Sequence, residues 1–265
     1  MYRLIFCLSL LLASAAHAAT RSVFLEDLTW TELRDAMTAG ATTIIIPVGG
    51  TEQNGPLMVL GKHNVRVKVL AGRIAAALGN ALVAPVVAYV PEGNISPPTE
   101  HMRFPGTITV PDDVFEKVLE SAARSFKQHG FTDIVLIGDH GGYQKDLGIA
   151  ADQLNKYWGQ GPARAHFIAE YYRASQADYA KALLGHGAKE SEVGTHAALA
   201  DTSLMLAVDP SLVRAAGLGG SAKLSAADGV YGGNPSQSSA ELGQFGVNLI
   251  ISKTVDAIRK ATTRH

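Results

Sequence analysis

Apolar runs and amphipathic segments alternate along most of the chain. The run ATTIIIPV at 41–48 is continuously apolar and rich in β-branched residues, which is typical of a strand buried on both faces. The pattern predicts further strands at 81–90, 131–138 and 163–172. Apolar residues spaced three and four apart predict helices around these strands, at 29–40, 64–80, 111–130, 143–159, 195–209 and from Glu241 or Phe245 onward.

Strands that alternate with helices predict a mostly parallel sheet covered by helices on both faces. We therefore expect an α/β fold, a three-layer α/β/α sandwich formed by one domain over residues 20–265, because no linker, repeat or low-complexity segment interrupts the pattern. In such sheets, ligands bind beyond the carboxyl ends of the strands. Three polar, glycine-rich segments follow predicted strands and are the candidate site, at 49–64, 91–107 and 138–143.

The first residues have the pattern of a secretory signal peptide. Arg3 precedes an apolar stretch, and Ala-His-Ala precedes Ala19, so residues 1–19 are predicted to be removed on export. An uncleaved N-terminal anchor is the alternative. We expect a periplasmic or secreted protein with no membrane attachment after cleavage. The single cysteine, Cys7, lies in this segment, so any metal site in the mature chain must use His, Asp and Glu.

Composition narrows the class of partner. The chain has 265 residues, 47% of them hydrophobic, and a formal net charge of -1, which gives no electrostatic footprint for nucleic acid. The sequence contains no G-x-S-x-G nucleophile motif, no phosphate-binding P-loop and no dinucleotide-binding glycine motif in a strand–helix context. A small-molecule partner must therefore be inferred from the polar segments themselves.

The segment GGTEQNGPLMVLGKHN carries Glu52 and His63, and the segment GDHGG carries Asp139 and His140. A carboxylate and two imidazoles that converge at one sheet edge can bind Zn²⁺ or a similar divalent ion. Spacing alone leaves alternatives open, because Glu52 could be a surface acid and His63 a solvated loop residue. His140 is the hardest to explain without a function, because the glycines after it allow a ligand to approach closely.

The segment THAALADTS adds His196 and Asp201 at the start of a predicted helix. Five helical steps separate them by roughly 140°, so they do not share one face closely, although side chains at a helix end can converge on one pocket. A satisfied helix-terminal histidine and a solvated acid are the alternatives. The segment TEHMRFPGT offers Glu100, His101 and Arg103, which could line the same opening.

Four segments together resemble, in order, the motifs of the creatininase (creatinine amidohydrolase) family: PVGGTEQNGP, HMRFPGTITV, GDHGG and THAALADTS. The resemblance covers nearly all of the predicted mature chain. It implies an α/β/α sandwich, a divalent-metal site, hydrolysis of C–N amide bonds that are often cyclic, and commonly a homohexamer. It also implies that Glu52 and His140 are metal ligands and that His196 is catalytic.

Other positions depart from the family pattern. Asn54 stands where the family has a histidine ligand, His63 where it has a bridging aspartate, and Gly142 where creatininase has a glutamate. Asp201 replaces a glutamate that is a ligand in some members. A bridging carboxylate can hold two cations, whereas a neutral imidazole binds one metal through one nitrogen. The departures therefore predict the loss of a second metal site.

We expect one divalent ion per chain, zinc first and manganese or iron as alternatives, bound by Glu52, His63 and His140, with Asp201 or water as the remaining ligand. Water activated by this ion would hydrolyse an amide, with His196 and Glu52 as catalytic residues. Four further residues are expected to contact substrate: Asn54, His101, Asp139 and Gly141. Creatinine itself is not expected as substrate, since neither Trp30 nor Trp158 matches the tryptophans of creatinine-hydrolysing members.

Two rival functions remain open. A degenerate homologue could bind a metal or ligand without turnover, which the changes at Asn54, His63 and Gly142 favour. A periplasmic solute-binding protein would need two similar lobes, and the sequence shows no such duplication.

Overall fold

A computed structural model describes residues 22–263 of the chain. The predicted signal segment, including Cys7, lies outside the described residues. At the centre is a four-stranded sheet in the order β2-β1-β3-β4, and each neighbouring pair is parallel. Its strands are β1 (Thr43–Val48), β2 (Ala81–Val83), β3 (Asp133–Gly138) and β4 (Arg164–Phe167). The predicted mostly parallel sheet is confirmed.

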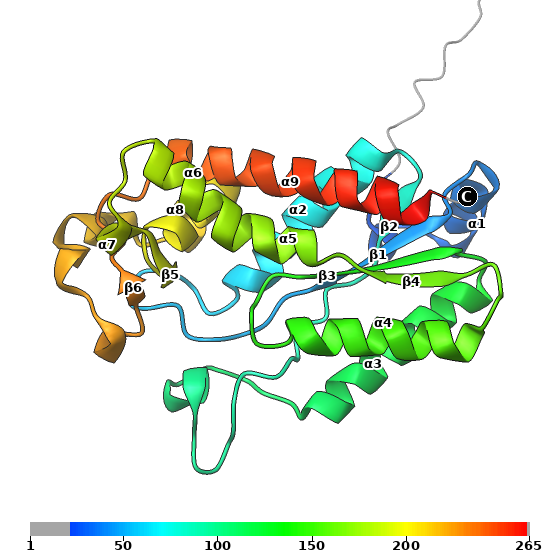
Figure 1. Cartoon of the computed structure of the whole chain (residues 1–265), viewed down its shortest axis with the longest axis horizontal. Helices are drawn as coiled ribbons and strands as arrows, with labels where there is room; N and C mark the ends of the chain where they lie inside the picture. Colours follow the sequence, from blue (N-terminus) through cyan, green and yellow to red (C-terminus); the bar gives the residue numbers. More distant parts are fainter. Residues whose placement is uncertain (1–21, 264–265) are drawn as a thin grey trace, which may run out of the picture.

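Helices cover both faces of this sheet, as the three-layer prediction requires (Figure 1). On one face, Ile45 and Val135 pack in a core with α2, α5 and α9; on the other, Ile44 and Leu136 pack with α3 and α4. A short antiparallel pair, β5 (Gly194–His196) and β6 (Tyr231–Gly233), lies apart from the main sheet. The helices are α1 (Trp30–Thr38), α2 (Lys62–Leu78), α3 (Asp112–Gln128), α4 (Gln144–Trp158), α5 (Ala169–Arg173), α6 (Tyr179–Gly185), α7 (Glu190–Val193), α8 (Leu199–Val208) and α9 (Ala240–Thr262).

Local chemistry explains where two of these helices begin and end. Thr29 caps α1: its side chain accepts from the Glu32 amide and the Glu32 side chain returns to Thr29, a complete capping box. Helix α2 ends at Gly79, whose φ of 83° is the left-handed conformation that glycine adopts without strain. Helix α2 begins at Lys62, two residues before the predicted start, so Lys62 and His63 lie in its first turn.

Three predicted elements differ from the structure. The strand predicted at 81–90 ends at Val83, two residues before Pro85, which has no amide hydrogen for a ladder. The strand predicted at 163–172 ends at Phe167, and helix α5 begins at Ala169. His196 lies on strand β5 opposite Tyr231, and α8 starts only at Leu199. The prediction that His196 and Asp201 share one helix is therefore wrong.

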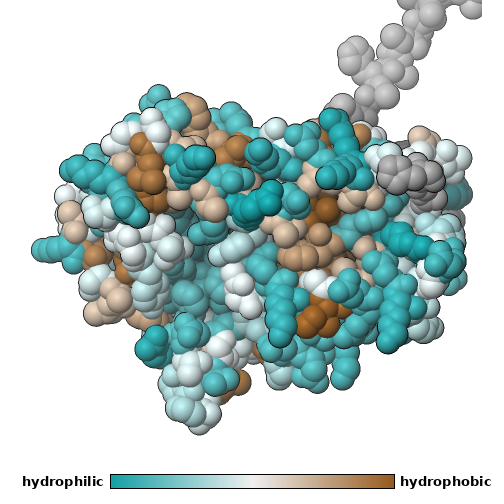
Figure 2. All heavy atoms as spheres, in the orientation of Figure 1, coloured by the Kyte–Doolittle hydropathy of each residue, from teal (hydrophilic) through white to brown (hydrophobic). Residues whose placement is uncertain are grey.

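The sheet edge that carries the candidate site faces the β5–β6 side of the molecule. The segments after β1, β2 and β3 all run toward this side, where hydrophilic residues surround a hollow in the surface (Figures 1 and 2). Within residues 22–263, no helix is both long and apolar enough to cross a membrane.

Candidate active site at the carboxyl ends of the strands

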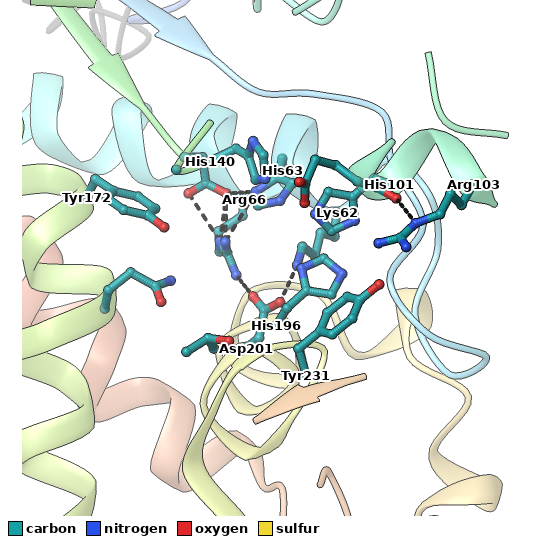
Figure 3. A pocket seen from close by; sticks show the side chains of 15 residues that line it. Lys62, His63, Arg66, His101, Arg103, His140, Tyr172, His196, Asp201 and Tyr231 are labelled. Atoms are coloured by element: carbon teal, nitrogen blue, oxygen red, sulfur yellow. Dashed lines mark hydrogen bonds and ion pairs between the residues drawn. The ribbon is translucent and has the colours of Figure 1, made fainter. Parts of the chain in front are cut away.

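A cavity of about 290 Å³ opens where the segments after β1, β2 and β3 meet the β5–β6 pair (Figure 3). Its walls combine buried charges with imidazole and phenol rings. Among the residues that line it are Lys62, Arg66, His101, His140, His196 and Tyr231. This volume is at the lower end of the range for small-molecule sites, so the cavity suits a small ligand.

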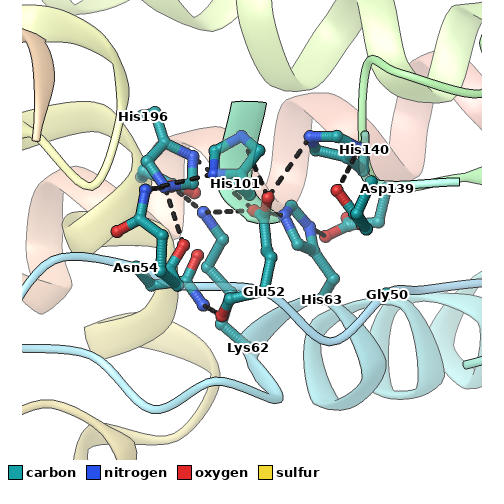
Figure 4. A network of polar contacts seen from close by, with 12 residues as sticks. Gly50, Glu52, Asn54, Lys62, His63, His101, Asp139, His140 and His196 are labelled. Carbon is teal, nitrogen blue, oxygen red and sulfur yellow. Dashed lines mark hydrogen bonds and ion pairs between the residues drawn. The ribbon is translucent and has the colours of Figure 1, made fainter. Parts of the chain in front are cut away.

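Glu52 is the centre of the site, and its side chain is fully buried (Figure 4). Its Oε1 atom lies 2.6 Å from His63 Nε2, 3.6 Å from His196 Nδ1 and 3.8 Å from Lys62 Nζ. Its Oε2 atom faces two other imidazoles, at 3.1 Å from His101 Nε2 and 3.4 Å from His140 Nε2. The two oxygens of one carboxylate therefore face two different sets of neighbours.

The Oε2 side contains the group of side chains best arranged to hold a metal ion. Glu52, Glu92, His101 and His140 each offer one ligand atom, and these atoms all lie within 4.8 Å of one another. We call these four residues the ligand cluster. Glu92 comes from the segment after β2, and one of its oxygens lies 3.4 Å from His140 Nδ1.

Glu92 is the residue whose position most needs an explanation. It is 2% exposed, and as an ionised carboxylate neither of its oxygens has a hydrogen-bond donor among the described residues; only the protonated carboxyl can hydrogen-bond, to the neighbouring Glu52 carboxylate. A buried polar group without partners is costly, so a carboxyl in this position indicates a missing ligand. Gly50 leaves room for it, because a Cβ atom there would lie 2.6 Å from Glu92 Oε1. Two carboxylates and two imidazoles are a donor set that suits Zn²⁺, Mn²⁺ or Fe²⁺.

The electrostatics of the ligand cluster agree with this interpretation. Burial, and then the nearby Glu52 carboxylate, raises the pKa of Glu92 to about 10. Burial alone would also raise the pKa of Glu52, but His140, His63 and Lys62 hold it well below its usual value. Burial lowers the pKa of His140 to about 3, so its imidazole is neutral at neutral pH and able to bind a metal. Without a cation, a proton therefore occupies Glu92, and a cation would displace it.

A second group of charged side chains lies beside the ligand cluster, and each of them is paired with an opposite charge. The Arg66 guanidinium contacts Asp139 at 2.8 Å and Asp201 at 2.5 Å, and the Lys62 ammonium is ion-paired with Asp201. We call Lys62, Arg66, Asp139 and Asp201 the ion-pair network. The Tyr171 hydroxyl also donates to Asp139, at 2.7 Å. All four charged side chains are buried.

This pairing keeps both aspartates of the network ionised. Burial by itself would raise the pKa of Asp139, but Arg66 and then His63 lower it below the usual value. The same competition, with Lys62 and Arg66 as the cations, lowers the pKa of Asp201 well below its usual value. Asp201 also accepts from the backbone N–H of Ala197 at 3.0 Å, which anchors a residue whose φ of 54° is uncommon for a side chain with Cβ.

The four predicted metal ligands are divided between these two arrangements. Glu52 and His140 belong to the ligand cluster, whereas His63 and Asp201 lie outside it. Both ring nitrogens of His63 are already engaged, at 2.6 Å from Glu52 and 2.6 Å from Asp139. Asp201 is paired with Lys62 and Arg66, so its oxygens have partners without a metal.

The four residues predicted to contact substrate do not all line the cavity. His101 and Gly141 line the cavity, and a Cβ atom on Gly141 would lie 2.5 Å from the Tyr172 hydroxyl. Asp139 lines it too, as part of the ion-pair network. Asn54 is buried, and its amide donates to the carbonyls of Glu52 and Val59, both at 2.9 Å. Asn54 therefore fixes the shape of the loop.

His196, the predicted catalytic histidine, is held by Gln53. Its Nε2 atom lies 3.0 Å from the Gln53 carbonyl and 3.1 Å from the Gln53 side-chain amide, which leaves Nδ1 on the side of Glu52. The same amide donates to His101 Nδ1 at 3.1 Å, and Gly55 N–H fixes the amide by donating to its oxygen at 2.8 Å. Burial, and next the Lys62 ammonium, lowers the pKa of His196 to about 3, so this imidazole is neutral at neutral pH.

Sequence reasoning missed Gln53, Lys62, Arg66 and Glu92 as parts of the site. The sequence did contain a signal for the two cations. Lys62, Arg66 and the apolar Leu70 are spaced four residues apart, so they lie on one face of α2, and this face is buried. Glu92 had a weaker signal, an acid beside Pro and Gly in the segment after a predicted strand.

Several known proteins to which the chain is similar are named as hydrolases or peptidases. The chain is 34% identical over 122 residues to the mycofactocin precursor peptide peptidase of Mycolicibacterium smegmatis, covering 44% of this chain and 46% of that protein. It is 30% identical over 120 residues to the 3-dehydro-scyllo-inosose hydrolase of Thermotoga maritima, covering 45% of this chain and 36% of that protein. These alignments span less than half of either relative. The creatinine amidohydrolase of Pseudomonas putida is 26% identical over 199 residues, with 73% of this chain and 75% of that protein covered.

Solved structures agree on the fold. A creatininase structure described with manganese superposes with a TM-score of 0.76 at 24% identity and covers 92% of this chain and 100% of that one. A creatininase variant described as a Zn–Zn type gives a TM-score of 0.72 at 24% identity, with the same coverage. The family model for creatininase, described as creatinine amidohydrolase, matches residues 26–258. The chain therefore belongs to the creatininase family.

Proposed function

We propose that this protein is a metal-dependent amidohydrolase that cleaves a C–N amide bond, linear or cyclic, in a small molecule. The observation that carries the proposal is the ligand cluster, in which two buried carboxylates and two neutral imidazoles converge beside a cavity of about 290 Å³. The names of two relatives, a peptidase and a creatinine amidohydrolase, support this reaction class.

Glu52, Glu92, His101 and His140 would hold one divalent ion, with zinc expected first and manganese or iron as alternatives. When bound, such an ion supplies a Lewis acid for the amide carbonyl and lowers the pKa of water. Both carboxylates are then needed in ionised form, which matches the two positive charges of one divalent ion.

His196 is placed to move a proton. Its Nδ1 atom faces Glu52, its Nε2 atom is fixed by Gln53, and its ring lines the cavity. A neutral imidazole can accept a proton from water and later deliver it to the leaving nitrogen. The Tyr172 hydroxyl also lines the cavity, and burial raises its pKa to about 12, so it remains a hydrogen-bond donor for a substrate oxygen.

The rival function is metal binding without turnover. It is favoured by one observation, the pairing of His63 and Asp201 within the protein, which removes two of the predicted ligands. We also propose, from the N-terminal pattern and the family, that the protein is exported and forms a homo-oligomer. Detection of the mature chain in a periplasmic fraction and light scattering of the purified protein would test these two points.

The deciding experiment combines metal analysis with an amide panel. The parent protein, purified without chelator, should contain about one zinc, manganese or iron per chain and hydrolyse at least one linear or cyclic amide of the panel. His140→Ala should lose both metal and turnover. His196→Asn should keep the metal and lose turnover by about 10²–10³-fold, the usual cost of removing a group that acts in the transition state.

His186→Ala is the matched control, because His186 is exposed and belongs neither to the cavity lining nor to the ligand cluster. It should keep both metal and turnover. A parent protein with one bound metal that hydrolyses nothing in a broad panel would support the rival function. Unchanged metal content and turnover in His140→Ala would overturn the proposed centre.

A further inference from the structure

Two buried cations at the start of α2 are not used by the proposed mechanism. Lys62 is 1% exposed and Arg66 is fully buried, and they lie one helical turn apart. Charged side chains are almost never fully buried unless they are paired, and long ones normally extend to water. Both of these instead line the cavity (Figure 3).

The charges of these two residues match those around them. Arg66 contacts Asp139 at 2.8 Å and Asp201 at 2.5 Å, and Lys62 is ion-paired with Asp201. Two positive charges therefore meet two negative charges, and the ion-pair network is neutral without any metal. Glu52 and Glu92 are the carboxylates that remain outside this network, and both belong to the ligand cluster.

The ligands on the Oε1 side of Glu52 are also occupied. His63 uses both ring nitrogens, one toward Glu52 and one toward Asp139. Lys62 Nζ lies 3.8 Å from the same Oε1 atom (Figure 4) and is also ion-paired with Asp201. A second divalent ion here would have to displace an ammonium from between two carboxylates, Glu52 and Asp201.

We propose that Lys62, assisted by Arg66, takes the place of a second metal ion beside Glu52. This inference rests on the proposed metal centre and extends it. A solved creatininase variant at 24% identity is described as a Zn–Zn type, so two ions do occur on this fold. In this chain, the second positive charge belongs to a side chain, because the Lys62 ammonium bridges Glu52 and Asp201. The substrate would therefore meet one exchangeable metal ion and one cation that is part of the protein.

The test counts metal ions and does not depend on turnover. The metal-free protein is titrated with zinc against a competing chelator, bound zinc is confirmed by elemental analysis, and cobalt absorption reports the number of distinct sites. The parent should bind one ion. Lys62→Met removes the ammonium at similar length and frees Asp201 beside Glu52 and His63, so it should bind two. Lys62→Arg keeps the positive charge and should bind one.

A double variant identifies the new ligand. Lys62→Met combined with Asp201→Asn removes the ammonium and the carboxylate together, so the count should return to one. Circular dichroism checks that each variant is folded, and a Lys62→Met protein that folds only with zinc is counted after refolding with zinc.

The outcomes separate this inference from the proposed function. Two ions in the parent would overturn the inference and leave the metal centre standing. One ion in a folded Lys62→Met would do the same. No ion in the parent would overturn the metal centre and the inference together. A count of two in Lys62→Met that persists in the double variant would also contradict the role of Asp201.

Discussion

The ligand cluster and the ion-pair network share one buried region, yet their hydrogen bonding is opposite. In the network, Arg66 and Lys62 neutralise Asp139 and Asp201, and both aspartates are held ionised without help from outside. In the cluster, an ionised Glu92 has no hydrogen-bond donor among residues 22–263, and its pKa is raised to about 10. Buried charge alone therefore does not indicate a metal site, whereas a buried carboxyl whose charge the protein does not compensate does.

Removing one cation from the network should produce the largest effect. Arg66→Met leaves Asp139 and Asp201 buried with fewer compensating charges, so the free energy of unfolding should fall by about 3–5 kcal/mol. Urea unfolding followed by circular dichroism measures this. A loss below about 1 kcal/mol would mean that the network is solvated and that the comparison with the ligand cluster is wrong.

Neutralising Glu92 tests the ligand cluster in the same way. Glu92→Gln removes a proposed ligand and a negative charge, so zinc affinity should fall by at least about 10- to 100-fold, the range seen when only the support of a ligand is removed. The metal-free protein should not be destabilised, because the glutamine amide can donate to Glu52 as the protonated carboxyl does. Chelator competition and thermal unfolding give the two quantities, and an unchanged affinity would exclude Glu92 as a ligand.

The pH dependence of zinc binding is a further test of Glu92 as a ligand. Since Glu92 is protonated below a pKa of about 10, each ion that binds must release that proton. Affinity should therefore rise by about tenfold per pH unit between pH 6 and 8. The metal-free protein has the opposite trend: a carboxyl with a raised pKa stabilises the fold at low pH, and this contribution is lost as pH rises toward the raised value. Glu92→Gln is the control. In this variant, zinc affinity and the stability of the metal-free protein should both depend less on pH, by the share that Glu92 contributes in the parent.

An exposed ion pair made by another residue of α2 gives the smallest expected effect. Lys68 pairs with Glu26, and both side chains are more than a third exposed. Lys68→Met should change the free energy of unfolding by about 0–1 kcal/mol, because solvent and salt screen such pairs. Measured beside Arg66→Met, it separates the effect of burial from the effect of losing a positive charge on α2.

Much of the fold could be predicted because its signals are local. The apolar run of β1, the amphipathic helices and the glycine-rich segments after the strands give a parallel sheet with its site at one edge. The strand predicted at 81–90 was too long, because Pro85 interrupts the ladder. His196 was placed on a helix because the apolar residues after it have helical spacing, whereas its pairing with Tyr231 is contributed by a distant segment.

The candidate site was harder to predict because partner choice is three-dimensional. Glu52, His140 and His196 could be named from motif order. Whether His63 binds a metal or an aspartate depends on Arg66 and Asp139, which the sequence does not bring together. The predicted ligand set with His63 and Asp201 stays a prediction, and the geometry favours Glu92 and His101 in their place.

The ligand cluster has one further consequence, for chain topology. Glu52, Glu92 and His140 come from three different strand-to-helix segments and are successively 40 and 48 residues apart. Closing loops of this length costs the chain several kilocalories per mole of conformational entropy. The sole cysteine is Cys7, so the chain after it has no disulfide of its own. An ion bound by these residues would join three separate segments of the folded chain. Because the site does not exist in the unfolded chain, the free energy of binding would add to the free energy of unfolding, and removal of the metal would lower the stability of the fold as well as stop the reaction.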